Sequence, residues 1–366
     1  MEKVKISGLQ LFILIFLFEL GTAIVVGLGF QAKKDAWLAV LIGMFAGLFI
    51  FLIYYALFRL YPDLPLTSYL KEILGKHLGV FVGILYLFYF LYDATRDVRD
   101  FGELLTTSTY IYTPIFVINF MMLFTVGYIL YHGIETLART GEILLIVLTF
   151  FGVIAAILIA VSGQWELNQL LPILENGWKP VLSTAFPLTL TFPFGEMIAF
   201  TIILPCLNRP KNALKIGLWG MIASGLILAE TMATNIAILG LNVASRSSFP
   251  LLAAMSLINL PNILQRLDII AVLALIIGGF LKIAVLYYAA VICAAEVFNV
   301  SDYRKLVFPL GVVILFSSIT VAGNFAEHIE EGLKIVPYYI HIYMQIAIPL
   351  LLLAVAFIRR KKWKRH

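Results

Sequence analysis

The sequence predicts an all-α, polytopic membrane protein that forms one domain over residues 1–366, with ten transmembrane helices in two inverted halves of five. Three observations predict this fold class. Hydrophobic residues make up 62% of the chain and charged residues only 13%, against roughly 25% charged residues in a soluble domain. Apolar runs long enough to cross a bilayer follow one another with short connections. The first and sixth runs are interrupted at corresponding positions.

Each apolar segment is long enough to cross the hydrocarbon core, because about 20 helical residues suffice. The connections between them are too short to fold as separate domains. The ten predicted helices cover Ser7 to Phe30, Trp37 to Leu60, Leu78 to Tyr110, Pro114 to Gly133, Gly141 to Gly163, Val181 to Leu207, Leu214 to Gly240, Leu267 to Phe298, Leu306 to Gly323 and Val336 to Arg359.

The distribution of Lys and Arg predicts the orientation of these helices, because cytoplasmic loops carry an excess of both residues. With the N-terminus inside, the cytoplasmic segments hold 17 of the 26 Lys and Arg residues and the outer segments hold 6. Both termini are therefore expected in the cytoplasm. The basic tail from Arg359 to Arg365 favours contact with anionic membrane lipid rather than with nucleic acid.

The first and sixth helices carry features that a plain membrane anchor lacks. The first contains Phe18 to Ile24, with Glu19 and Gly21 at mid-membrane depth, and the sixth contains Phe192 to Ile198, preceded by Pro187. At an offset of 174 residues the two stretches share Phe, Gly and Ile. Interrupted helices in matching positions of two inverted halves indicate a solute site at the midplane. The alternative is that the glycines only permit close packing and the prolines only bend the helices.

The third helix concentrates ionisable side chains at membrane depth, where each needs a partner or a water-lined cavity. Spacing i,i+4 predicts two ion pairs, Arg96 with Asp100 and Arg99 with Glu103. Asp93 and Asp97 then remain without a partner on one face, with Tyr89 one turn before them. In the functional interpretation this face looks into the bundle. In the structural interpretation it is the hydrated outer end of a long helix.

Lys282 lies midway along the eighth helix, beside Leu281. Because a lone buried ammonium costs several kcal/mol, we expect a carboxylate partner at one of the breaks, either Glu19 or Glu196. Glu230 belongs to a polar patch of the seventh helix and is expected to be a further buried charge.

The sequence predicts neither a metal site nor a cofactor. His341 in the tenth helix has no metal-ligand spacing around it, so a structural role is expected. The sequence contains no HExxH or GxSxG motif, and we do not expect an enzyme.

Several stretches together resemble the spore germination permease family. They are LGTAI at residues 20–24, TRDVRDFGE at 95–103, LPILENGWKPVL at 171–182, FGE at 194–196 and the basic tail. The members of this family are GerAB-type B subunits of nutrient germinant receptors, placed in the amino acid, polyamine and organocation (APC) transporter superfamily. The resemblance spans nearly the whole chain.

This resemblance implies a permease-like, APC (LeuT-like) fold that senses a small nutrient, often an amino acid. It also implies a position beside the A and C subunits of a germinant receptor in the spore inner membrane. In sodium-coupled relatives a cation lies between the first and eighth helices, and Lys282 would take that place here.

Two functions remain open: a germinant-sensing receptor subunit, and a proton-coupled amino acid transporter. The expected nutrient site comprises Gly21, Thr22, Ala23, Tyr89, Asp93, Phe194, Gly195, Glu196, Leu281 and Lys282. The expected coupling or buried charges are Glu19, Asp97 and Glu230.

Overall fold

The chain is helical throughout in a computed structural model that describes residues 5–258 and 268–363. Within these residues there is no strand, and one isolated bridge pairs Ile6 with Leu207. The elements, with η marking 3-10 or π helix, are α1 Gly8–Leu20, η1 Phe30–Asp35, α2 Ala36–Leu60, α3 Leu66–Leu74, α4 Lys76–Ser108, α5 Ile115–Tyr131, α6 Ile134–Ser162, η2 Leu167–Leu170, α7 Trp178–Thr184, η3 Ala185–Thr189, η4 Phe194–Ala199, α8 Phe200–Ile203, η5 Leu204–Cys206, η6 Pro210–Asn212, α9 Ala213–Ala244, α10 Pro250–Leu257, α11 Asp268–Val297, α12 Arg304–Thr320, α13 Phe325–Glu330, η7 Glu331–Ile335, η8 Pro337–Ala347 and α14 Ile348–Trp363.

Seven helical segments among the described residues are long and apolar enough to cross a membrane, so the chain is a multi-pass membrane protein. The other three predicted spans fall on α1 and α5, which are shorter apolar helices, and on α12 with α13 and η7, a pair bent by 106°. The seven are Phe30–Leu60, Lys76–Ser108, Ile134–Ser162, Trp178–Cys206, Pro210–Ala244, Asp268–Val297 and Pro337–Arg359.

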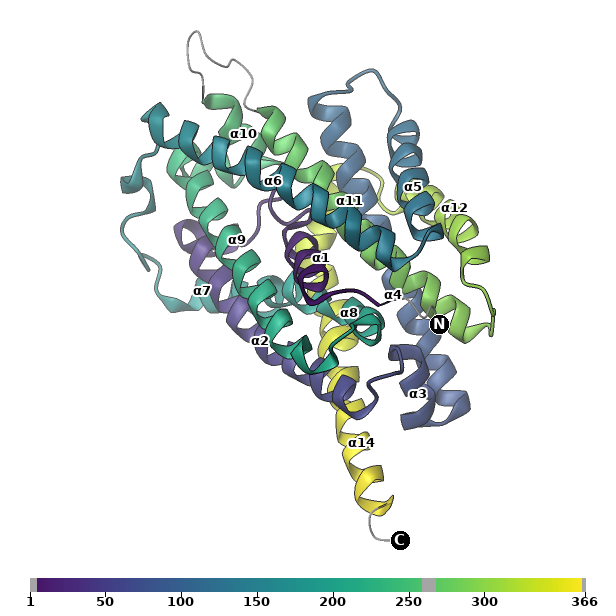
Figure 1. The fold of residues 1–366 in the computed structure, drawn as a ribbon. Coiled ribbons are helices and arrows are strands. Elements are labelled where there is room, and N and C mark those ends of the chain that lie inside the picture. The colour runs from purple at the N-terminus through teal and green to yellow at the C-terminus, as the bar shows by residue number, and fades with distance from the viewer. Residues whose placement is uncertain (1–4, 259–267, 364–366) are drawn as a thin grey trace.

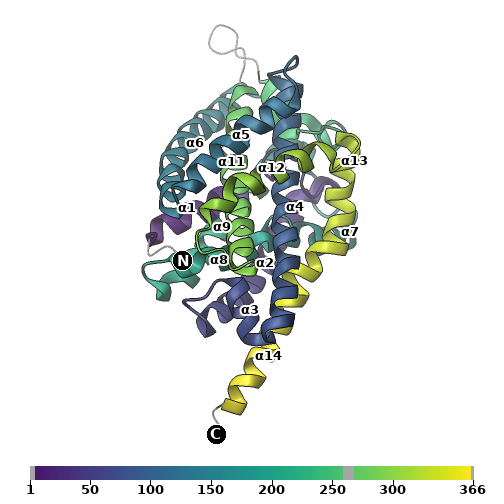
Figure 2. The same ribbon diagram turned by 90° about the vertical axis from the view of Figure 1, so that its right-hand side faces the viewer.

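The core of the bundle lies around α11. Of its apolar stretch 83% is buried, against 6% for α6, so α11 is central and α6 is peripheral. α11 packs mainly along α4, and α1 packs against both α9 and α11 (Figure 1). Figure 2 shows α14 extending beyond the rest of the molecule at the C-terminal end.

The first predicted span, Ser7 to Phe30, is wrong in its second half, because the regular helix ends at Leu20. Ser7 begins α1 with a capping box. Gly21 ends it with φ 28° and ψ −129°, a conformation that strongly favours glycine. A Cβ at Gly21 would also lie 2.5 Å from the Lys282 side chain, so glycine is needed for the close approach to α11.

The sixth predicted span, Val181 to Leu207, is interrupted repeatedly. Within Trp178–Cys206, α-helical turns alternate with π and 3-10 turns, and Phe186 has non-helical φ −121° and ψ 120°. Pro187 and Pro193 favour this irregularity because proline lacks the N–H that an α-helix uses. The apolar stretch of this segment is 94% buried, as expected for irregular backbone at membrane depth.

Segments predicted to be cytoplasmic contact one another in two places. The bridge of Ile6 to Leu207 joins the N-terminal segment to the end of the sixth span. Arg359 Nη1 donates to Glu72 O at 3.1 Å, which joins the last helix to α3. Some residues used for the predicted boundaries and the charge count lie outside the described residues: Lys3, Arg266, Leu267, Lys364 and Arg365.

Candidate functional site

The two breaks meet at the ammonium group of Lys282, which comes from the middle of α11 and is fully buried. Its Nζ lies 2.6 Å from Glu196 Oε2 in η4 and 3.8 Å from Asp97 Oδ1 in α4. The Phe192 ring lies over the ammonium at 4.2 Å from its centroid, within range of a cation–π interaction. Of the two carboxylates expected to hold the lysine, the structure brings Glu196 to it.

Asp97 connects this ion pair to the break that follows α1. Thr22 Oγ1 donates to Asp97 Oδ1 at 2.8 Å, and both side chains are buried. Glu19, near the end of α1, is also fully buried, but neither of its carboxyl oxygens has a hydrogen-bond partner among the described residues. Glu19 is therefore a buried carboxylate at the first break whose oxygens accept no hydrogen bond from any described residue.

A second polar cluster joins α4 to η8 in the last span. Gln345 Nε2 donates to Tyr89 Oη at 2.7 Å and lies 3.1 Å from His341 Nδ1. On the other side of the imidazole ring, His341 Nε2 lies 3.6 Å from Asp93 Oδ1. Tyr89 and Asp93, which the sequence places one turn apart, thus both contact the last span, Tyr89 through Gln345 and Asp93 through His341.

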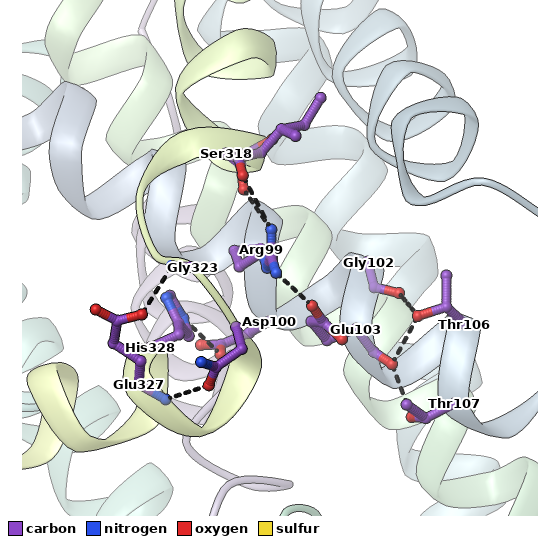
Figure 3. A network of polar contacts seen from close by, with 12 residues as sticks. Arg99, Asp100, Gly102, Glu103, Thr106, Thr107, Ser318, Gly323, Glu327 and His328 are labelled. Atoms are coloured by element: carbon purple, nitrogen blue, oxygen red, sulfur yellow. Dashed lines mark hydrogen bonds and ion pairs between the residues drawn. The ribbon is translucent and has the colours of Figure 1, made fainter.

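The C-terminal half of α4 contacts the end of α12 through Arg99 (Figure 3). Arg99 Nη2 lies 2.7 Å from Glu103 Oε1, so the predicted i,i+4 pair is present. Its Nη1 also donates to Ile319 O at 3.2 Å, in the last turn of α12. This stretch of α4 is packed against protein, as the interior interpretation requires.

The other predicted i,i+4 pair, Arg96 with Asp100, is wrong. Asp100 Oδ1 lies 3.0 Å from His328 Nε2 in α13 (Figure 3). Arg96 donates to the backbone carbonyl of His328 and lies 3.8 Å from Glu331 Oε2. The reason is that the bent segment after α12 places His328 and Glu331 beside Arg96 and Asp100. Each of these two side chains pairs with that segment instead of with the other.

A cavity of about 40 Å³ lies between these groups. Its lining includes charges of both signs, and the bent segment α13–η7 closes one side of it. A small cavity with a few convergent polar groups is suited to recognising a small polar solute. The ionisable lining residues are Asp93, Arg96, Asp97, Asp100, Glu196 and His341.

Several expected site residues lie next to this centre without lining the cavity. Gly21 packs against Lys282, and Gly195 packs against the amide of Gln345, which a Cβ at Gly195 would overlap. Tyr54 Oη of α2 donates to Gly195 O at 3.1 Å. These contacts leave both glycines at positions where a side chain has no space.

Three other expected residues are buried elsewhere. Phe194 packs against α2, where a Cβ added at Gly47 would lie 2.5 Å from its Cβ. Leu281 is directed towards α6, where a Cβ at Gly141 would lie 3.6 Å from its Cδ1. Ala23 is fully buried, but no polar contact involves its side chain.

Glu230 was expected to be a buried charge, and the structure corrects this. Its side chain is exposed on α9 and accepts a hydrogen bond from Thr234 Oγ1 at 2.8 Å. Leu226 and Ile227, within one turn of it, are 53% and 41% exposed, so this face of α9 is turned outward from the bundle.

Three residues of the centre were missed by the sequence reasoning: Phe192, His341 and Gln345. Phe192 lies in the break of the sixth predicted helix, where the expected site residue was Phe194. His341 and Gln345 are spaced i,i+4 on one face, a pattern that could have indicated a polar stripe facing inward. Their partners on α4 are about 250 positions away in the sequence, with a separation of 256 positions for Gln345 and Tyr89, and no local pattern links them.

The chain is similar in sequence to known proteins over most of its length. A family model described as "Spore germination protein" matches residues 5–326. The chain is 42% identical to Spore germination protein KB of Bacillus subtilis (strain 168) over 362 residues, which is 99% of this chain and 97% of that protein. It is 26% identical to Spore germination protein YndE of the same strain over 340 residues, 91% of this chain and 89% of that protein.

Proposed function

Because the chain belongs to the spore germination protein family, we propose that it is a germinant-sensing, permease-like receptor subunit that binds a small nutrient, such as an amino acid, in the buried cavity. The observation that carries the proposal is the fully buried Lys282, held by Glu196 where the two interrupted segments meet. Interrupted helices around charged groups at membrane depth are typical of solute sites in transporters.

The charges around the cavity support an amino acid as the ligand. Asp93 Oδ2 is buried and has no hydrogen-bond partner among the described residues. Arg96 brings a guanidinium group to the same cavity. Together they offer one charge of each sign, which suits a molecule that carries both an amino group and a carboxylate.

Nutrient binding is tested by thermal unfolding of the purified protein with each standard amino acid, simple sugars and nucleosides, because a ligand raises the stability of the state it binds. At least one compound is expected to raise the Tm of the wild type. Asp93→Asn should abolish that shift, whereas the matched control Asp302→Asn, at an exposed loop position, should retain it. An equal shift in Asp93→Asn would contradict the site, and the absence of any shift would contradict nutrient binding by this chain.

A proton-coupled amino acid transporter is the second candidate, and the unsatisfied carboxylate of Glu19 favours it. A buried carboxylate between two helix breaks can take up and release a proton as solute passes. Measuring solute uptake into reconstituted vesicles that have either an acidic interior or an acidic exterior distinguishes the two functions. Uptake that depends on the proton gradient and is lost in Glu19→Gln supports transport, and nutrient binding without uptake supports a receptor.

We further propose the full ten-span arrangement, with inverted halves of the APC type and both termini in the cytoplasm. Each of the ten predicted segments falls on an apolar helix, although two of these helices are short and one segment is bent. The interrupted backbone lies in the first and sixth segments, as an inverted repeat of five requires.

The proposed setting is the spore inner membrane, together with the A and C subunits of a germinant receptor. Family membership supports this setting, and the names of both relatives refer to spore germination. Affinity purification of the tagged chain from detergent-solubilised spore membranes should recover an A-type and a C-type subunit. Recovery of the chain without either subunit would contradict the assembly.

A further inference from the structure

We propose that Asp93, Glu196 and His341 form a binding site for a divalent transition-metal ion such as Zn²⁺. One ligand atom from each residue lies within 4.8 Å of the other two, and all three side chains are buried. One imidazole nitrogen with two carboxylate oxygens is a donor set that suits Zn²⁺. The three residues come from α4, η4 and η8, so no spacing along the sequence indicates the site.

Two polar atoms of these side chains lack a hydrogen-bond partner. His341 Nε2 and Asp93 Oδ2 are buried and have no hydrogen-bond partner among the described residues, and each residue is only 4% exposed. A buried polar atom left without a partner costs about 1–3 kcal/mol. One metal ion would satisfy both atoms.

Gln345 is placed to support His341 as a ligand. The Gln345 amide lies against His341 Nδ1 at 3.1 Å and Tyr89 Oη at 2.7 Å, while its Oε1 has no partner among the described residues. With the amide turned over, Oε1 accepts from both His341 Nδ1–H and Tyr89 O–H. The Nε2 lone pair of His341 is then free for the metal, the usual arrangement of a metal-binding histidine.

Charge balance favours a dication over a single positive charge. Asp93, Asp97 and Glu196 share one buried ammonium, that of Lys282. When all three carboxylates are ionised, two negative charges remain, which one dication neutralises. Lys282 contacts Glu196 through Oε2, and we assign the other oxygen, Oε1, to the metal, since ligating carboxylates commonly hydrogen-bond through their second oxygen.

The cavity supplies space for a further ligand. All three proposed metal ligands line it, so a metal held by them keeps a coordination position directed into the cavity, as in exchangeable zinc sites with three protein ligands. The ion would occupy Asp93, which the proposed nutrient site also uses. Metal binding is therefore measured without nutrient, so that failure of one proposal is distinguishable from failure of the other.

The experiment uses the full-length chain, purified in detergent with a tag that contains no histidine and stripped with a chelator. Zn²⁺ is the probe, with its amount measured by elemental analysis and its Kd by competition with a fluorescent chelator. The wild type is expected to bind one Zn²⁺ per chain. His341→Gln should weaken binding more than about 100-fold, because loss of a ligand exceeds the roughly 10- to 100-fold effect of losing a supporting group.

His328→Gln is the matched control. His328 is also buried and lies 3.0 Å from a carboxylate, that of Asp100, but it belongs to no three-ligand group among the described residues. The His328→Gln variant should bind Zn²⁺ with wild-type affinity. Failure of the wild type to bind one Zn²⁺ overturns the proposal, and so does equal affinity in the wild type and His341→Gln.

Gln345→Leu provides a second test should His341→Gln fail to fold, as judged by size-exclusion chromatography. It keeps all three ligands and removes only the support of the imidazole ring. The proposal expects a Zn²⁺ affinity roughly 10- to 100-fold below wild type. Wild-type affinity in this variant would mean that the ion lies away from His341.

Discussion

At the scale of single residues, the ion pair of Lys282 and Glu196 determines how the centre tolerates substitution. Their side chains are 0% and 5% exposed, so each charge depends on the other rather than on water. Removing one partner leaves an uncompensated buried charge, whereas removing both charges leaves a neutral pair of similar shape. The single variants should therefore lose more stability than the double variant.

Lys282→Met is expected to lower the free energy of unfolding by about 3–5 kcal/mol. Adding Glu196→Gln should recover part of that loss, because it removes the orphaned charge. Adding Glu19→Gln should recover less, because neither carboxyl oxygen of Glu19 has a hydrogen-bond partner among the described residues. Thermal unfolding of the single and double variants measures this coupling, and equal recovery by Glu19→Gln would argue against the pairing with Glu196.

Two adjacent glycines of α11 provide a matched test of the packing at the first break. A Cβ at Gly278 would lie 2.9 Å from Gly21 O, whereas a Cβ at Gly279 meets nothing closer than 3.8 Å. Gly278→Ala should destabilise the protein by about 1–3 kcal/mol through overpacking. Gly279→Ala should leave the Tm near that of wild type. A similar Tm in both variants would show that the backbone of residue 21 does not press against α11.

At the scale of elements, the C-terminal half of α4 is joined to α12 by Arg99. Its guanidinium pairs with Glu103 and donates to the last-turn carbonyl oxygens of α12, and its side chain is 9% exposed. Arg139 forms the same type of i,i+4 pair with Glu135 on α6, but its side chain is 70% exposed. The two arginines therefore differ in burial and in tertiary contacts, while their local spacing is the same.

Arg99→Gln is expected to lower the free energy of unfolding by about 2 kcal/mol, because partly buried carbonyl and carboxylate groups lose a charged partner. Arg139→Gln should change it by less than about 0.5 kcal/mol, as is usual for exposed pairs. Denaturant unfolding of both variants in the same detergent gives the comparison. Equal effects would mean that the contact with α12 contributes no stability.

At the scale of the whole molecule, the charge distribution makes a prediction about membrane orientation. Reporters fused after Lys211 and after Lys362 should read cytoplasmic, whereas reporters within Glu166 to Lys179 and within Glu327 to Lys334 should read external. An external reading after Lys362 would give an odd number of spans. The inverted repeat of two five-helix halves would then have to be abandoned.

The sequence by itself determined the features that depend on local composition. Apolar runs in the sequence indicate the membrane helices. A glycine and polar residues within such a run indicate the break at Gly21. The need of Lys282 for a carboxylate partner also followed from sequence, because the cost of a buried charge does not depend on the fold. Family membership, expected from five short stretches, was confirmed by the match over residues 5–326.

The tertiary structure alone decided which of these groups meet. It selected Glu196 over Glu19 for Lys282, turned Arg96 and Asp100 away from each other, and left Glu230 exposed. It also brought His341 and Gln345 of the last span to Asp93 and Tyr89 of α4. The physical reason is that helix periodicity fixes neighbours only within one or two turns, whereas a contact between helices depends on how each is rotated and on where its backbone breaks.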